Sequence, residues 1–92
     1  MANAIISMKI MQTSPDVDLN SMETKVKEIV VKHVGEGEIR AEHVPVAFGL
    51  KSLNIIFVMD EQNHKLDPIE EEIAALEGVN SVEVTDVRRA LG

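Results

Sequence analysis

Apolar residues recur at every second position in two segments of this chain, less regularly in two more, and at helical spacing in two others. A period of two places alternate side chains on one face of a strand, whereas a period near 3.6 builds one apolar stripe along a helix. The segments run strand, helix, strand, strand, helix, strand, with expected bounds of 4–13, 19–35, 38–46, 50–60, 67–78 and 79–87. Two strand–helix–strand units of this kind fold into one sheet. The sequence therefore predicts an α+β, ferredoxin-like βαββαβ sandwich: a four-stranded antiparallel sheet with both helices on one face.

The 92 residues suffice for one modest core, and no linker or repeat divides them, so residues 1–92 are expected to form a single domain. Only two aromatic side chains are present, so aliphatic residues and Met must fill the interior. The absence of cysteine excludes disulfides and favours an intracellular, cytoplasmic home. We expect no membrane segment, because the longest apolar run, Ile55–Met59, is too short to span a bilayer.

The chain is acidic, with sixteen carboxylates against nine Lys and Arg and a net charge of −7. Direct nucleic-acid binding needs clustered cations that neutralise phosphates, and no such cluster is evident. An acidic balance instead favours encounter with basic protein surfaces.

The helix ends carry recognisable capping signals. Asp18 or Asn20 is expected to cap the first helix. For the second, Asp67 is the expected cap, Pro68 the first helical residue, Glu70 the closing member of a capping box and Gly78 the stop signal.

Nothing in the sequence indicates catalytic chemistry. The histidines His33, His43 and His64 lack the spacing of metal ligands. His33 is expected to meet the dipole at the end of the first helix, and His64 to lie in a solvated connector. Three consecutive glutamates, 70–72, suit the positive start of a helix and splay around its axis. We therefore expect no catalytic residue, no metal site and no cofactor.

Two features are left unexplained by the fold. The stretch "HVPVAFGLKSLNI" puts Phe48 and Gly49 at the expected tip between the second and third strands, after Pro45 ends the ladder. The last strand ends with Arg88 and Arg89. An exposed ring and a cationic end are typical of a protein interface. The alternatives are a ring folded back onto its own sheet and arginines that are only solvated surface charge.

The residues also resemble a known family. "VPVAFGLKSLNIIFVMDE", residues 44–61, is similar to the guanine-exchange domain of translation elongation factor 1-beta, which carries a Val-Pro-(Ile/Val)-(Gly/Ala)-(Phe/Tyr)-Gly-(Ile/Leu)-Lys segment before an apolar strand. "EEEIAALEGVNSVEVTDVRRAL", residues 70–91, is similar to the final helix and strand of the same domain. The likeness covers essentially the whole chain, and the short length resembles the archaeal form.

The resemblance implies exchange of GDP for GTP on elongation factor 1-alpha, the GTPase that delivers aminoacyl-tRNA. Phe48 matches the family's aromatic, which packs into a pocket on the GTPase, and Lys51 matches the lysine of the segment. Alignment places Arg89, with Arg88 beside it, where the family has a lysine that reaches toward the magnesium and phosphate region. Either arginine keeps the charge but changes its shape.

Other functions share this fold. A small-molecule regulatory domain of the ACT type is the main alternative, and an acylphosphatase-like enzyme is a third. The enzyme needs an anion-cradling loop with an arginine after the first strand, and "QTSPDVDLN" has no cation. A partner for the second sheet face, which carries Ile5, Met11, Ile56 and Val58, is left open.

Overall fold

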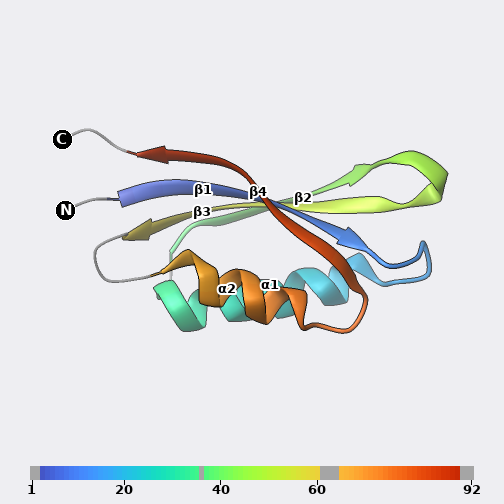
Figure 1. Cartoon of the computed structure of the whole chain (residues 1–92), viewed down its shortest axis with the longest axis horizontal. Helices are drawn as coiled ribbons and strands as arrows, with labels where there is room; N and C mark the ends of the chain where they lie inside the picture. Colours follow the sequence, from blue (N-terminus) through green and yellow to red (C-terminus); the bar gives the residue numbers. More distant parts are fainter. Residues whose placement is uncertain (1–2, 36, 61–64, 90–92) are drawn as a thin grey trace.

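A computed structural model describes residues 3–35, 37–60 and 65–89. The elements are β1 (Asn3–Gln12), α1 (Leu19–Val34), β2 (Ile39–Pro45), a 3₁₀ turn η1 (Ala47–Gly49), β3 (Lys51–Asp60), α2 (Leu66–Ala74) and β4 (Val79–Arg89). This is the βαββαβ order expected from the sequence, and the ferredoxin-like α+β fold is confirmed (Figure 1). His64, expected in a solvated connector, lies outside the described residues.

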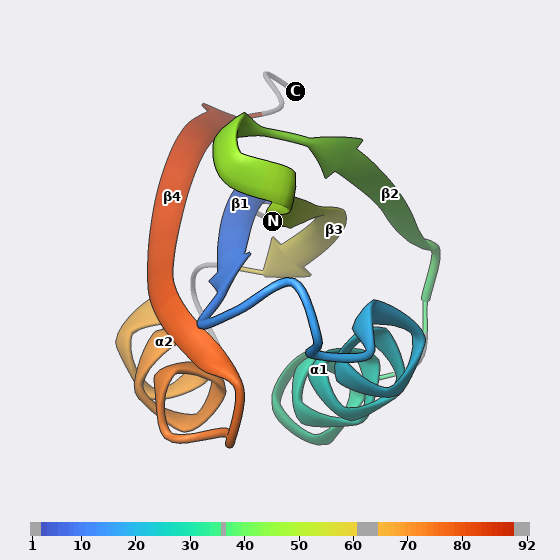
Figure 2. The same cartoon turned by 90° about the vertical axis from the view of Figure 1, so that its right-hand side faces the viewer.

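The four strands form one sheet in the order β2-β3-β1-β4, and every neighbouring pair is antiparallel. β1 and β3 are therefore central, and β2 and β4 form the two edges. Figure 2 shows α1 and α2 side by side beneath the sheet, with the opposite side uncovered by either helix. Both helices lie on one face, as predicted.

The core lies between the sheet and the helices. Every second residue of β1 from Ala4 to Ile10 is buried, and the matching residues of β3 face the same way. The buried apolar residues of the core are Ala4, Ile6, Met8, Ile10, Leu19, Met22, Val26, Val30, Leu53, Ile55, Phe57, Met59, Ile69 and Ile73. Phe57, one of the two aromatic residues, is 1% exposed and is the largest of these side chains.

Strand β4 reaches the core through two irregularities. Its valines fall at positions 79, 82, 84 and 87, which strict alternation would divide between the two faces. Shifts of register beside Thr85 and Asn80 return all four to the face that packs against β1 and the core. Thr85 Oγ1 donates a hydrogen bond to the Ser7 carbonyl at 3.3 Å. The strand also continues to Arg89, two residues beyond the predicted end at Val87.

The first helix begins where the sequence indicates. Asp18 is the N-cap, and its Oδ1 accepts a hydrogen bond from the Asn20 backbone N–H at 2.9 Å. The backbone N–H of Gly35 donates to the Val31 carbonyl at the other end, at 2.9 Å. Of the two candidate caps, Asp18 is confirmed.

The predicted ends of the second helix are wrong. Lys65 is the N-cap, without a side-chain capping bond, so Asp67 lies inside the first turn and no capping box forms with Glu70. Pro68 is tolerated there because the first backbone N–H groups of a helix lack partners anyway. The helix ends at Ala74 rather than near Gly78, since the Leu76 N–H turns back to the Ile73 carbonyl at 3.0 Å.

Glu70 is half-buried at this helix start. Burial raises the pKa of its carboxyl, and the neighbouring charge of Asp67 adds to the effect. A carboxylate in a satisfied capping box would be expected to shift the other way.

Candidate partner-binding site

The connection between β2 and β3 is a short loop closed by its own backbone. Pro45 pairs with Lys51 at the end of the β2–β3 ladder. This position suits proline, because proline has no N–H to donate within a ladder. Beyond it, the Val46 N–H donates to the Leu50 carbonyl at 2.8 Å, and the Leu50 N–H donates to the Ala47 carbonyl at 3.2 Å. These two bonds hold the residues between them at the tip of the hairpin.

Phe48 occupies that tip, and its ring is 95% exposed. Its backbone has φ 61° and ψ 30°, the left-handed region that bulky residues avoid at a cost of about 1–2 kcal/mol. It is the only residue other than glycine with positive φ in the described part of the chain. The structure thus holds the ring in solvent in a strained conformation, and the interpretation of a ring folded onto its own sheet is wrong.

Gly49 follows with φ 76° and lies close to the β1–α1 loop, since a Cβ built there would be 3.8 Å from the Pro15 ring. A second tie comes from Gln12, which is buried at the end of β1. Its Oε1 accepts from the Lys51 N–H at 2.8 Å, and its Nε2 donates to the Val17 carbonyl at 3.0 Å. This residue braces the base of the hairpin.

The sequence reasoning missed Gln12 as part of this site. Its signal was visible: the residue continues the series Ala4, Ile6, Met8 and Ile10 on the buried face, where a polar side chain needs hydrogen-bond partners. Lys51 is exposed beside this brace. Ser52 is buried, and its Oγ lies 3.2 Å from Asn54 Oδ1 and 3.4 Å from the Val44 carbonyl oxygen.

Arg88 and Arg89 lie within β4 rather than beyond it. Arg88 pairs with Ile5 on the helix-free face, and Arg89 pairs with Ala4 on the face that bears the helices. Arg88 Nε donates to Asp86 Oδ2 at 2.7 Å, and 78% of the Arg88 side chain stays exposed. Because neighbours in a strand point to opposite faces, the two guanidinium groups do not form one patch.

The hairpin and the arginines stand at opposite ends of the sheet (Figure 1). Ala4 of β1 pairs with both Arg89 and Met59, and eight residue steps along β3 separate Met59 from Lys51. At the rise of a strand this is about 26 Å, before the hairpin loop is counted. The longest dimension of the chain is 43 Å. The structure therefore brings Pro45, Gly49 and Lys51 together with Phe48 but keeps both arginines apart from them.

Two histidines lie within hydrogen-bonding distance of glutamates that also pair with lysines. His43 Nε2 lies 2.9 Å from Glu23 Oε1, and Lys27 Nζ lies 2.9 Å from the other oxygen of that carboxylate. This cluster ties α1 to β2, and the hydrogen bond from Lys27 lowers the pKa of Glu23.

A second cluster joins the two helices. Lys32 Nζ donates to Glu72 Oε1 at 2.7 Å, and His33 Nε2 contacts the other carboxylate oxygen. The hydrogen bond from Lys32 lowers the pKa of Glu72. Among residues 3–35, 37–60 and 65–89, no group of three His, Asp or Glu side chains is placed to hold a metal ion.

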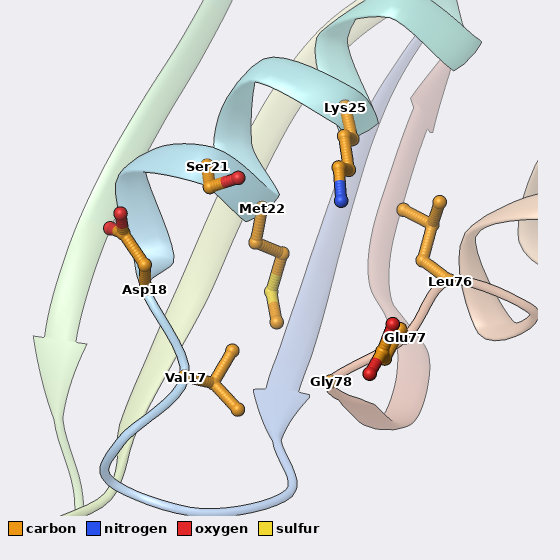
Figure 3. A pocket seen from close by; sticks show the side chains of 8 residues that line it. All are labelled: Val17, Asp18, Ser21, Met22, Lys25, Leu76, Glu77 and Gly78. Carbon is orange, nitrogen blue, oxygen red and sulfur yellow. The ribbon is translucent and has the colours of Figure 1, made fainter.

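A small hollow of about 200 Å³ opens between the start of α1 and the α2–β4 turn (Figure 3). Met22 points from the helix toward Val17, and Leu76 and Gly78 border the opposite side. Its charged members, Asp18, Lys25 and Glu77, are all exposed. The hollow is therefore an open surface feature without a buried polar anchor for a small ligand. Within the described part of the chain, neither helix is long and apolar enough to cross a membrane.

Comparison with known proteins identifies the family. The EF-1 guanine nucleotide exchange domain matches residues 5–90. Elongation factor 1-beta of Methanosphaera stadtmanae is 37% identical over 91 residues, covering 99% of this chain and 100% of that protein. The protein of the same name from Methanothermobacter thermautotrophicus is 35% identical over the same coverage, and one from Methanococcus maripaludis is 38% identical over 87 residues, 95% of this chain and 97% of that protein. The chain therefore belongs to the EF-1 guanine nucleotide exchange family, in its short archaeal form.

Proposed function

We propose that this chain engages elongation factor 1-alpha through the hairpin tip at Phe48 and so promotes release of its GDP. Membership of the family makes the chain a guanine nucleotide exchange factor in translation elongation, acting without covalent catalysis. The family assignment favours nucleotide exchange over the alternative of an ACT-like regulatory domain. What we add is the role of particular residues.

The observation that carries the proposal is the state of Phe48. Its ring is 95% exposed although the chain has only one other aromatic residue, and its backbone is held in a costly conformation. Strained, exposed residues persist where surrounding structure enforces them, and they cluster at ligand and partner sites. Burying an aromatic ring in a partner's pocket removes about 150–250 Å² from water. Such a ring is the expected anchor of an interface.

The second contact is cationic. Bound GDP is held by a backbone cradle, a lysine and Mg²⁺. A guanidinium brought near the phosphates competes with the metal, whose small coordination shell tolerates little displacement. Because Phe48 and the arginines lie at opposite ends of the sheet, the GTPase must contact the chain over at least about 26 Å. We infer that the anchor and the cation act on separate parts of the GTPase.

The exchange activity is tested by release of fluorescent GDP from elongation factor 1-alpha in excess unlabelled nucleotide. We expect the chain to accelerate release and Phe48→Ala to lose most of the acceleration. Val31→Ala is the matched control, because Val31 is a partly exposed apolar residue near the end of α1, which leads to the start of β2 and not to the hairpin at its end. Normal exchange by Phe48→Ala would refute the role of the ring. No acceleration by the folded wild-type chain would reject the activity.

Single substitutions distinguish the roles of Arg88 and Arg89. The arginine that enters the nucleotide site should, when changed to Ala, lower the maximal exchange rate more than the affinity for the GTPase. Equal losses in rate and affinity would indicate a docking role instead. Arg88→Ala also releases Asp86, so Asp86→Ala serves as its control.

We propose further that the chain acts in the cytoplasm on GDP-bound or nucleotide-free GTPase, without direct nucleic-acid or membrane contact. The net charge of −7 supports the expected lack of contact with nucleic acids and membranes, because phosphate surfaces repel an acidic protein.

A further inference from the structure

The face of the sheet that the helices leave uncovered carries an apolar patch. Ile5, Ile56 and Val58 are 43%, 42% and 50% exposed. Ile5 pairs with Val58 across β1 and β3, and Ser7 pairs with Ile56 two residues further along. Residues that pair across neighbouring strands form a row, so Ile5 and Val58 lie in one row and Ser7 and Ile56 in the next row on this face. The three side chains are therefore neighbours on the two central strands, and we call them the apolar patch.

Opposite charges border the patch on the β2 side. Arg40 pairs with Ile56, and Glu38 lies one row further along, beside Val58. Arg40 Nε lies 3.1 Å from Glu38 Oε1, so both side chains are on this face. The row of Val58 thus ends in a carboxylate, and the row of Ile56 ends in a guanidinium.

On the β4 side the order of charges is reversed. Arg88 pairs with Ile5, and Asp86 pairs with Ser7, and the two charged groups are 2.7 Å apart. The row that begins with a carboxylate on β2 therefore ends with Arg88 on β4. The other row begins with a guanidinium and ends with Asp86. The four charges, which we call the corner charges, alternate in sign around the apolar patch.

We propose that the occupant of this face is a second copy of the chain, packed sheet against sheet. An alternating set of corner charges is complementary to itself when turned over by a two-fold axis in the interface. With the axis across the strands, Glu38 meets Arg40 of the second copy, Asp86 meets Arg88 of the second copy, and Ile56 packs on Val58 of the second copy. Aligned sheets pack face to face in this way.

The neighbouring row selects this axis. Glu42 on β2 and Glu83 on β4 share the row of Asn54 and Lys9. An axis along the strands would place these two glutamates opposite each other, and like charges brought together destabilise an interface. The axis across the strands avoids this contact.

The available area sets the strength of the dimer. Four strands at their usual spacing are about 19 Å wide, and the ten residues of β3 span about 33 Å, which gives roughly 600 Å² per copy. A standard interface uses about 800 Å² on each partner. We therefore expect a weak dimer, in rapid exchange with the monomer and visible only at high concentration.

Sedimentation velocity over a concentration series up to about 1 mM tests the proposal. Arg40→Glu should raise the dimer dissociation constant at least about tenfold, because it sets carboxylates against Glu38 of each copy. The double variant Glu38→Arg/Arg40→Glu should restore dimerisation, since the swapped pair meets its opposite under the axis across the strands. Under the other axis the swap would bring like charges together. The double variant also keeps the internal ion pair, so loss of folding does not confuse the result.

Val58→Lys should abolish the dimer, whereas Val31→Lys on α1 and Phe48→Ala at the hairpin should leave it unchanged. A chain that stays monomeric throughout the series, or a dimer indifferent to Val58→Lys and Arg40→Glu, would overturn the proposal. If the chain is monomeric and Val58→Lys weakens binding to elongation factor 1-alpha, the face serves the GTPase and the second copy is the wrong occupant. Dimerisation is measured without the GTPase, so the result is independent of the proposed function.

Discussion

The backbone strain at Phe48 predicts that two variants lacking the same ring differ in stability. Phe48→Ala removes a side chain that is 95% exposed, so the free energy of unfolding should stay within about 0.5 kcal/mol of the wild type. Alanine keeps the cost of the left-handed conformation at φ 61°. Phe48→Gly removes it, because glycine adopts positive φ without a clash.

The size of the difference follows from two opposing contributions. Relief of the left-handed backbone is worth about 1–2 kcal/mol. The greater freedom of glycine in the unfolded chain opposes this by about 0.5–1 kcal/mol. At the middle of these two ranges, Phe48→Gly should therefore be more stable than Phe48→Ala by about 0.75 kcal/mol, which raises the Tm by about 4 °C in a chain of this size.

Thermal and urea unfolding followed by circular dichroism measure the two variants side by side. Both should lose exchange activity equally, because neither has the ring. If Phe48→Gly is no more stable than Phe48→Ala, the backbone at the hairpin is not strained. The inference from strain to function then fails, whatever the activity of the variants.

Three further predictions concern residues that support the site or the fold. Gln12→Leu should lower the free energy of unfolding by about 2 kcal/mol, because the Lys51 N–H and the Val17 carbonyl lose their partner; unchanged urea unfolding would contradict the brace. Gly78→Ala should cost about 2 kcal/mol or more, since φ is +92° and a Cβ would lie 2.9 Å from Val17 Cγ1; a Tm equal to that of the wild type would rule out this close approach. Glu72 has a lowered pKa, so its ion pair stabilises the fold above the ordinary value near 4.5 and is lost as the pH falls through the lowered value. Glu72→Gln should therefore lower the Tm near neutral pH and match the wild type in acid; an equal deficit at both would show that the charge is unimportant.

The sequence allowed the fold to be predicted because its periodicities are clear. Alternation in β1 and β3 and the stripe of α1 specify which faces are buried, and Asp18 begins α1 as its side-chain chemistry requires. The predicted start of α2 was wrong because Asp67 and Pro68 satisfy the rules for an N-cap and a first helical residue. The helix in fact begins two residues earlier, with Lys65 as its N-cap. Local signals of this kind fix an end only to within a few residues.

The candidate site was only partly predictable. The place of Phe48 at a hairpin tip could be predicted, but an exposed ring and a ring folded back onto the sheet were both open, and the structure decides for exposure. The left-handed backbone of Phe48 could not be predicted, because Gly49 alone would satisfy the usual demand of such a turn. The separation of Arg88 from the hairpin depends on the pairing of β1 with both β3 and β4, which is a long-range property. Gln12 was overlooked because its partners lie 5 and 39 residues away.

The most direct test of the account is the affinity of the chain for elongation factor 1-alpha in two states, nucleotide-free and loaded with GDP. A factor that weakens GDP binding must itself bind the GDP-loaded form more weakly by the same ratio. We predict tighter binding to the nucleotide-free form, typically by about 5–150-fold, and a loss of affinity for that form in Phe48→Ala. Equal affinity for the two forms would contradict the account, because a protein that binds both states alike shifts neither.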